Sequence, residues 1–241
     1  MSKIKIIVFM HFERICIIPA RAGSKRIKNK NIKKFFKQPI ISYAIKEAIK
    51  SKLFDKVIVS TDSKKIANIA KKYGGKIFFL RPKKISNDSA TTQEVIIHSL
   101  NWFKKKKIFP KIICCIYPAT PLLKYKDLKK SYLNFKKKKW EFMLTAIKYS
   151  SPIQRSLYFR NKRLKPLNLN NFKKKTQDLK DFYYDARQFY WGTDKAWKKK
   201  DTIKSCRTTI YEMSRFSAID INDIQDWELA KILFKKNKIK K

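Results

Sequence analysis

Short apolar runs alternate with helix-patterned segments over the first 147 residues of this chain. Between the runs, apolar residues recur at helical spacing, most clearly in 41–49, 64–73 and 91–103. Thr91 and Glu94 form a capping-box pattern at the start of the last of these helices. The alternation predicts an α/β fold of three layers, with a mostly parallel sheet and helices on both faces. The runs expected to form buried strands are residues 15–18, 56–60, 77–80, 112–117 and 142–147.

The first apolar run opens into a basic loop, residues 19–31. In parallel α/β folds, ligands bind at the carboxyl ends of the strands, where this loop begins. Small residues such as Gly23 and Ser24 let backbone N–H groups approach an anion closely. The loop therefore predicts a phosphate site, although from charge alone a solvated basic turn is an equal alternative. The side chains able to neutralise a phosphate are Arg21, Lys25, Arg26 and Lys30.

The formal net charge of +42 is a strong compositional signal, but its distribution argues against a dedicated nucleic-acid surface. Only ten of the 60 basic residues are arginines, and the lysines are scattered through every segment. Nucleic-acid binders concentrate basic charge on one element. We therefore expect a solvated surface with weak polyanion binding at low salt and no specific nucleic acid. A basic nucleic-acid-binding α/β protein is the alternative from a different class.

Membrane insertion and metal binding by cysteine are not predicted. No apolar run reaches the roughly 18 residues that span a membrane. The four cysteines, at positions 16, 114, 115 and 206, show no metal-binding spacing. Reduced thiols inside a cytoplasmic protein are the simplest interpretation.

The chain is expected to form one domain with an insertion. We predict an N-terminal extension over residues 1–13, a single domain over 14–234 and a frayed basic tail over 235–241. The strand–helix rhythm breaks at about 148–214, where the sequence is aromatic-rich and irregular. This segment is predicted to be an inserted lobe that covers the cleft and contributes to an oligomer interface. A short strand at 216–219 and a helix at 225–234 are expected to follow.

Several motifs together resemble one enzyme family. The basic loop carries Pro-Ala-Arg at 19–21, Gly-Ser-Lys-Arg at 23–26 and Asn31, and Asp-Ala-Arg-Gln-Phe-Tyr-Trp-Gly covers 185–192. From residue 15 to about 234 the chain resembles the CMP-sialic acid synthetase (acylneuraminate cytidylyltransferase) family, and it is most similar to the pseudaminic acid branch. The resemblance implies a nucleotide-diphospho-sugar transferase-like fold. It also implies transfer of CMP from CTP to the anomeric hydroxyl of an acidic nine-carbon sugar, with release of pyrophosphate, for surface glycan synthesis.

The same resemblance assigns roles to individual residues. For catalysis it implies Arg21, Lys30 and Asp220. For sugar binding the candidates are Gln154, Arg155, Gln177 and Tyr190, and ordinary packing is an equal alternative for each. Mg²⁺ would be held by Asp220 and Asn222. The nucleotide-binding residues would be Ala20, Arg21, Gly23, Ser24, Lys25, Asn31, Arg81, Ala90 and Thr92.

The chain departs from the family pattern at four positions. Ala22 and Arg187 stand where the family has glycine, and Lys28 replaces proline. Asn222 replaces the second aspartate of an Asp-x-Asp metal motif, which removes one charge from the predicted Mg²⁺ site. The resemblance further implies a homodimer with the lobe as contact. N-acetylneuraminic, legionaminic and 3-deoxy-manno-octulosonic acids are the alternative acceptor sugars.

Overall fold

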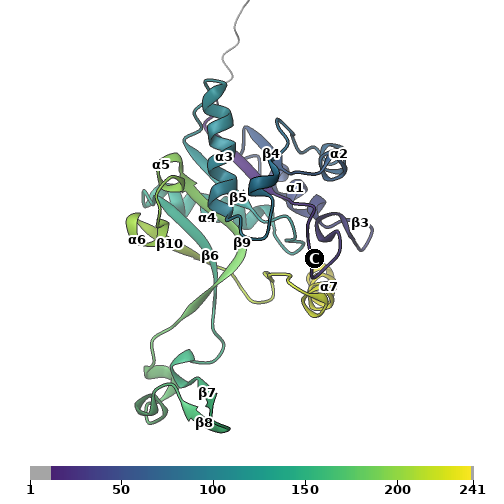
Figure 1. Cartoon of the computed structure of the whole chain (residues 1–241). Coiled ribbons are helices and arrows are strands. Elements are labelled where there is room, and N and C mark those ends of the chain that lie inside the picture. Colours follow the sequence, from purple (N-terminus) through teal and green to yellow (C-terminus); the bar gives the residue numbers. More distant parts are fainter. Residues whose placement is uncertain (1–11, 240–241) are drawn as a thin grey trace, which may run out of the picture.

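A six-stranded sheet lies at the centre of the computed structural model, which describes residues 12–239 (Figure 1). The strand order is β10-β6-β9-β5-β1-β4. β9 is antiparallel to both of its neighbours, and the other pairs are parallel, so the mostly parallel sheet is confirmed. The strands are β1 (Arg14–Pro19), β4 (Lys56–Ser60), β5 (Ile112–Ile116), β6 (Phe142–Lys148), β9 (Tyr183–Thr193) and β10 (Thr208–Glu212).

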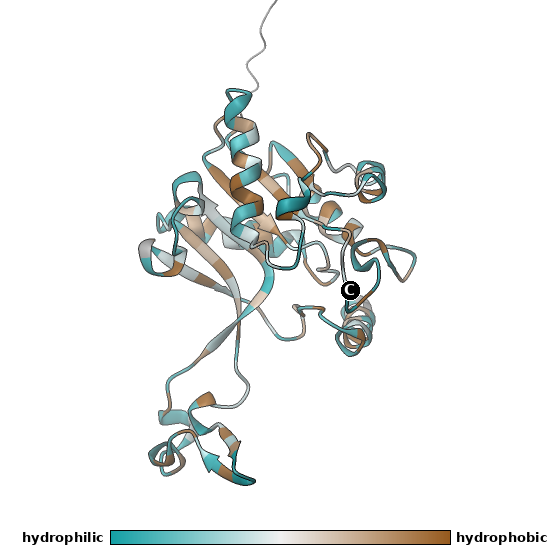
Figure 2. Ribbon diagram, in the orientation of Figure 1, coloured by the Kyte–Doolittle hydropathy of each residue, from teal (hydrophilic) through white to brown (hydrophobic). Residues whose placement is uncertain are grey.

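Helices cover both faces of this sheet, as the alternation predicts. One face packs against α1 (Ile41–Lys50), α2 (Lys64–Lys72) and α4 (Tyr125–Lys137), and the other against α3 (Thr92–Lys105) and α5 (Asp194–Trp197). The strands are buried on both sides because alternate residues point into the two cores. In β1, Cys16 and Ile18 lie in one core, and Ile15 and Ile17 lie in the other. In Figure 2 the central strands are accordingly brown along much of their length.

The last long helix, α7 (Ile224–Ile239), packs beside the basic loop rather than on the sheet. Trp227 of α7 contacts Phe35, which lies in the small hairpin of β2 (Lys34–Phe35) and β3 (Gln38–Pro39), with ring centroids 5.4 Å apart. Buried Ile27 and Ile221 join the same cluster. This cluster fixes α7 against the segment that follows β1. The expected frayed tail is wrong for residues 235–239, which continue α7; the extension expected at 1–13 lies almost entirely outside the described residues.

Two of the predicted strands do not form. Residues 77–80 contribute one isolated bridge, Leu80 with Thr61, and a second bridge joins Lys76, just before the run, to Ile58, so this segment borders β4 without a continuous ladder. Residues 216–219 form a turn and coil, and the edge of the sheet beside β6 is instead formed by β10. α6 (Thr202–Ser205) precedes β10.

The inserted lobe projects from the body between β6 and β9 (Figure 1). It contains the hairpin of β7 (Leu157–Arg160) and β8 (Arg163–Pro166) and short 3-10 turns. The projecting part covers residues 149–182, so the expected range of 148–214 is too wide: β9 and β10 belong to the sheet. No lobe residue lines the main pocket described below, so within one chain the lobe does not cover the cleft.

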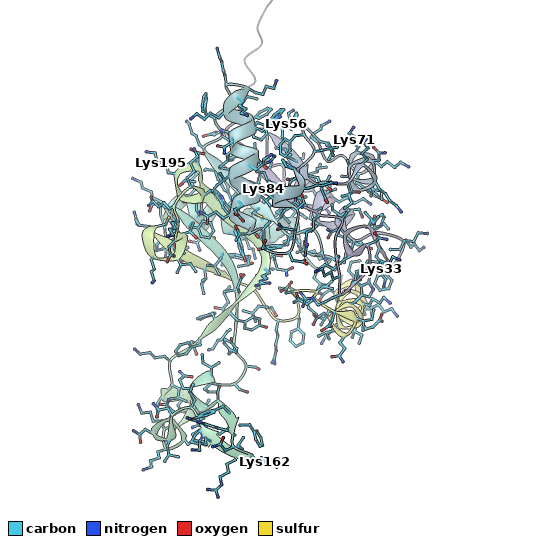
Figure 3. All side chains as sticks on the ribbon, in the orientation of Figure 1. Lys33, Lys56, Lys71, Lys84, Lys162 and Lys195 are labelled. Atoms are coloured by element: carbon cyan, nitrogen blue, oxygen red, sulfur yellow. The ribbon has the colours of Figure 1, made fainter. Side chains whose placement is uncertain are left out.

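Within the described residues, no helix has the length and apolar character needed to cross a membrane. All four cysteines are free, and Cys16, Cys114 and Cys115 are buried as expected. The lysines labelled in Figure 3 are spread over the body and reach the end of the lobe, in agreement with the scattered distribution in the sequence.

Candidate active site

A cavity of about 450 Å³ opens at the carboxyl edge of β1 and β5. Five separate segments line it: the basic loop after β1, residues 81–95, the turn after β5, the Arg187 region of β9 and residues 220–222. This is the edge at which parallel α/β folds bind ligands. The predicted residues that the structure brings together here are Arg21, Ser24, Lys25, Lys30, Asn31, Arg81, Ala90, Thr92, Asp220 and Asn222.

The basic loop is fixed by contacts of its own backbone. Asp62, after β4, accepts a hydrogen bond from the Ala22 N–H at 2.9 Å, and the Asn31 amide donates to the Arg21 carbonyl at 2.9 Å. Ala20 is fully buried behind the cavity, and its N–H donates to the Ser60 carbonyl. A methyl group built on Gly23 would contact only the Arg21 guanidinium, at 3.9 Å. Ala20 and Gly23 are therefore outside the cavity wall, although they were predicted to bind nucleotide.

Positive charge dominates the cavity. Arg21, Lys25, Arg26, Lys30, Arg81 and Arg187 line it, against the carboxylates Asp88 and Asp220. Asp88 pairs with Arg21 and, at 2.7 Å, with Lys25; the hydrogen bond from Lys25, followed by that from Arg21, lowers the pKa of Asp88. Arg21 and Lys25 thus share one carboxylate partner, which a phosphate group could replace. A polyanion such as a triphosphate fits this charge distribution.

Arg81 is the most deeply buried cation of the cavity, with only 5% of its surface exposed. Its backbone N–H donates to the Thr61 carbonyl at 2.8 Å, but its Nε and Nη2 atoms have no hydrogen-bond partner among the described residues. Burial lowers its pKa, an effect partly offset by Asp62. The Oδ1 atom of buried Asn31 is likewise without a described partner. Buried polar atoms of this kind are expected to be satisfied by a ligand or by water.

Lys30 connects the basic loop to the segment before α7. Its Nζ donates to the Ile221 carbonyl at 2.7 Å, and Arg26 donates to Asn222 Oδ1 at 2.9 Å. Burial lowers the pKa of Lys30, and the nearby carboxylate of Asp220 partly offsets this shift. Two segments nearly 200 residues apart in sequence therefore form one wall of the cavity.

The predicted Mg²⁺ ligands are adjacent but already engaged. Asp220 Oδ2 accepts from the Asn222 amide at 2.9 Å and lies 3.5 Å from the Arg187 guanidinium. Asp223 accepts from the Asp226 N–H at 3.0 Å, which assigns Asp223 to the cap of α7. Among the described residues, no group of three or more acidic, histidine or cysteine side chains is arranged to hold a metal. One carboxylate and one amide oxygen fit Mg²⁺ because this ion commonly takes few protein ligands together with substrate phosphates.

A chain of hydrogen-bonded side chains runs from the cavity wall into the protein. The Thr92 and Tyr117 hydroxyls are 2.9 Å apart, those of Tyr117 and Tyr190 are 3.5 Å apart, and Tyr190 donates to Asp185. Burial raises the pKa of Tyr117 to about 12 and also raises that of Tyr190, so both stay protonated. Tyr190, a predicted sugar ligand, is therefore one layer behind the wall, whereas Tyr117, to which the sequence assigned no role, lines it.

The other three predicted sugar ligands lie in the lobe and not at the cavity. Gln154 donates to the Lys180 carbonyl at 2.7 Å. Arg155 donates to the carbonyls of Lys174 and Asn171, and Gln177 belongs to a 3-10 turn of the same lobe. Within a single chain the Gln154 and Arg155 side chains connect different segments of the lobe. Asp88 and Arg187 were not assigned binding roles, yet both line the cavity.

A basic cavity at the carboxyl edge of a three-layer α/β sheet is the kind of site at which α/β folds bind phosphorylated ligands such as nucleotides. Two solved structures share this fold. One is a CMP:2-keto-3-deoxy-manno-octonic acid synthetase complexed with CTP, with a TM-score of 0.69 and 13% identity over 93% of this chain and 99% of the other. The second is a 4-diphosphocytidyl-2C-methyl-D-erythritol synthase from Anaerococcus prevotii, with a TM-score of 0.64 and 14% identity over 92% and 98%.

Sequence comparison identifies the family. The cytidylyltransferase family model matches residues 15–239, so the chain belongs to the cytidylyltransferase family. It is 38% identical to the pseudaminic acid cytidylyltransferase of Campylobacter jejuni serotype O:2 over 226 residues, which cover 93% of this chain and 97% of that protein. A second relative is a Helicobacter pylori protein named pseudaminic acid cytidylyltransferase and UDP-2,4-diacetamido-2,4,6-trideoxy-beta-L-altropyranose hydrolase. The two are 36% identical over 217 residues, which cover 90% of this chain and 41% of that protein. The family expected from the motifs is confirmed.

Proposed function

We propose that this protein transfers CMP from CTP to the anomeric hydroxyl of an acidic nine-carbon sugar, with pseudaminic acid as the preferred acceptor, for surface glycan synthesis. The observation that carries the proposal is the similarity over nearly the full length of both chains to pseudaminic acid cytidylyltransferases. The basic cavity supports it because a nucleoside triphosphate supplies the negative charge that the six lining cations require.

The buried polar atoms favour one orientation of CTP. Arg81 Nε and Nη2 are donors without described partners, and cytosine offers two acceptors, O2 and N3, on one edge. Ala90 and Thr92 line the cavity beside Arg81, and Asn31 Oδ1 is available to accept from a ribose hydroxyl. The phosphates would then extend toward Arg21, Lys25 and Lys30, where charge-assisted hydrogen bonds replace the contacts with Asp88.

In the proposed reaction, the anomeric oxygen of the sugar forms a bond with the α-phosphorus of CTP. The bond from that phosphorus to the bridging oxygen breaks, pyrophosphate leaves, and the hydroxyl proton passes to solvent or to a nearby carboxylate. Phosphoryl-type transfers depend chiefly on alignment and on neutralising charge on phosphate oxygens. Arg21 and Lys30 would supply that neutralisation, because their contacts hold them in the cavity before substrate binds.

We also propose Mg²⁺ as cofactor, which Asp220 and Asn222 would hold together with the nucleotide. When bound, the ion would neutralise phosphate charge. The support is the oxygen donor set of these two residues at the cavity wall. Asn222 is held in place by its own N–H, which donates to Asp226 at 2.7 Å.

A homodimer would give the lobe residues access to the sugar. Gln154, Arg155 and Gln177 do not reach the cavity of their own chain, so a role in sugar binding requires the cavity of a second copy. The lobe exposes an apolar surface that suits such a contact: Phe159 is 75% exposed, and the other exposed members are Leu157, Tyr158, Leu164, Leu167 and Leu169 (Figure 2). We place the enzyme in the cytoplasm, where CTP is available and the free cysteines stay reduced.

The test is release of pyrophosphate from CTP with a panel of acceptors: pseudaminic, N-acetylneuraminic, legionaminic and 3-deoxy-manno-octulosonic acids. We expect turnover with pseudaminic acid at the highest kcat/KM. Asp220→Ala should abolish turnover, while Glu228→Ala, which removes an exposed carboxylate on α7, should leave it unchanged. A different preferred sugar would change the assigned acceptor. Absence of release with every sugar, together with DNA binding that survives physiological salt, would instead support the nucleic-acid-binding alternative.

A further inference from the structure

Arg187 occupies a backbone position that suits glycine better than arginine. Its φ is 47°, in the left-handed region, and the Asp185 carboxylate accepts its N–H at 2.9 Å. The ladder between β6 and β9 is irregular at this point, because its register shifts between Leu144 and Ala146. Such irregularities re-aim side chains near functional sites. Here the local structure directs the Arg187 side chain into the cavity.

The guanidinium of Arg187 lies between two carboxylates. Its Nη1 atom is 3.5 Å from Asp220 Oδ2, and its Nε is 3.9 Å from Asp185 Oδ2. The second proposed metal ligand, Asn222, donates to Asp220 and accepts from Arg26. In the nucleotide-free protein, therefore, each of the two proposed Mg²⁺ ligands has an arginine as its partner.

We infer that Arg187 pairs with Asp220 in the nucleotide-free protein and competes with a divalent ion for that carboxylate. The ion therefore binds together with the nucleotide and not to the free protein. This inference rests on the proposed function, in which Asp220 is a metal ligand. In the dielectric of water, one positive charge about 5 Å from a divalent ion weakens its binding about tenfold. A bound triphosphate reverses the balance, because it brings oxygen ligands for the ion and a new anionic partner for the guanidinium.

Binding of Mn²⁺, a spectroscopic probe for a Mg²⁺ site, to the nucleotide-free protein tests this inference directly. Free Mn²⁺ is measured by electron paramagnetic resonance in titrations of the full chain. We expect Arg187→Gly to bind Mn²⁺ about tenfold more tightly than the wild type, and glycine is compatible with the local backbone. Arg187→Lys should retain the weak wild-type binding, because it keeps the charge. In an Arg187→Gly/Asp220→Ala double variant the gain should disappear.

Lys162→Gly is the matched control. Lys162 also has a positive φ, of 58°, and lies at the far end of the lobe (Figure 3), so the change removes the same charge from a comparable backbone position. We expect wild-type Mn²⁺ binding from this variant. An equal gain in Lys162→Gly would assign the effect to net charge and overturn the inference, as would unchanged binding in Arg187→Gly or a gain that survives loss of Asp220.

Adding CTP separates the inference from the function on which it rests. With saturating CTP, the Mn²⁺ affinities of the wild type and Arg187→Gly should agree within about threefold. A tenfold difference in affinity that persists with CTP would refute the inference that the nucleotide draws Arg187 away from Asp220. Failure of the proposed reaction is detected in a different assay, in which the wild type would release no pyrophosphate with any acceptor. The competition between Arg187 and a metal at Asp220 would still be supported by tighter Mn²⁺ binding in Arg187→Gly.

Discussion

Replacing Arg81 by methionine is expected to stabilise the free protein and to weaken its binding of CTP. The side chain is 5% exposed and has two N–H groups without described partners. An unsatisfied buried polar group costs about 1–3 kcal/mol. Methionine has a similar length and no donor, so the substitution removes this cost, while the favourable interaction of Arg81 with Asp62 is lost. We expect a net gain of about 1–2 kcal/mol, or a rise in Tm of roughly 2–8 °C for a chain of this size.

The same substitution should remove the donors assigned to cytosine. A hydrogen bond from a charged group contributes about 1.5–3 kcal/mol, so the Kd for CTP should rise about 10- to 100-fold. The preference for CTP over UTP should also decrease, because uracil presents an N3–H donor where cytosine presents an acceptor. Thermal unfolding of the free protein and calorimetric titration with CTP and UTP, both at physiological salt, measure the two effects.

Arg163→Met is the control for this experiment. Arg163 is an exposed arginine at the start of β8 in the lobe, so neither Tm nor nucleotide affinity should change. The reasoning would be refuted if Arg81→Met lowered the Tm and left CTP binding intact. That pair of results would mean that Arg81 is satisfied in the free protein and does not bind the base.

Three further substitutions test other parts of the site. Arg21→Ala should lower kcat at least ~10²-fold if its guanidinium stabilises the transferring phosphate, and an unchanged rate in a folded variant would contradict that role. Asn222→Asp should keep or raise activity by strengthening the metal site; complete loss would show that the amide is required. The pKa of Lys30 is lowered in the folded state, so the free energy of unfolding of the wild type relative to Lys30→Met should rise with pH from that lowered pKa to about 10.4. Urea unfolding of both proteins at pH 7–10.5 measures this difference. A difference that does not change with pH would contradict the prediction.

The parallel part of the fold was predictable from sequence because its signals are local. Each of β1, β4, β5 and β6 is a short apolar run buried on both faces, and Thr91 with Glu94 forms the capping box expected for α3. β9 was not predicted as a sheet strand. Its first residues are exposed and polar, and its place between β5 and β6 depends on a return from the lobe that no local pattern specifies.

The candidate site likewise contains residues that local sequence predicts and residues whose placement depends on the whole fold. The cations of the basic loop lie within one short segment, so their sequence pattern already indicated a phosphate site, and the cavity includes them. The placement of Gln154, Arg155 and Gln177 could not be predicted, because it depends on how far the lobe extends from the sheet. Arg187 shows the opposite case: its departure from glycine was visible in the sequence, but its pairing with Asp220 required the three-dimensional structure.

The attachment of the lobe has a consequence for how proteins with this sheet can diverge. Lys148 and Tyr183 are paired neighbours on the adjacent strands β6 and β9, so the lobe leaves and re-enters the sheet at one point. An insertion with closely spaced ends can be lengthened, shortened or exchanged while the register of every core strand stays the same. Variation in this segment can therefore alter the surface and the reach of the lobe independently of the nucleotide pocket.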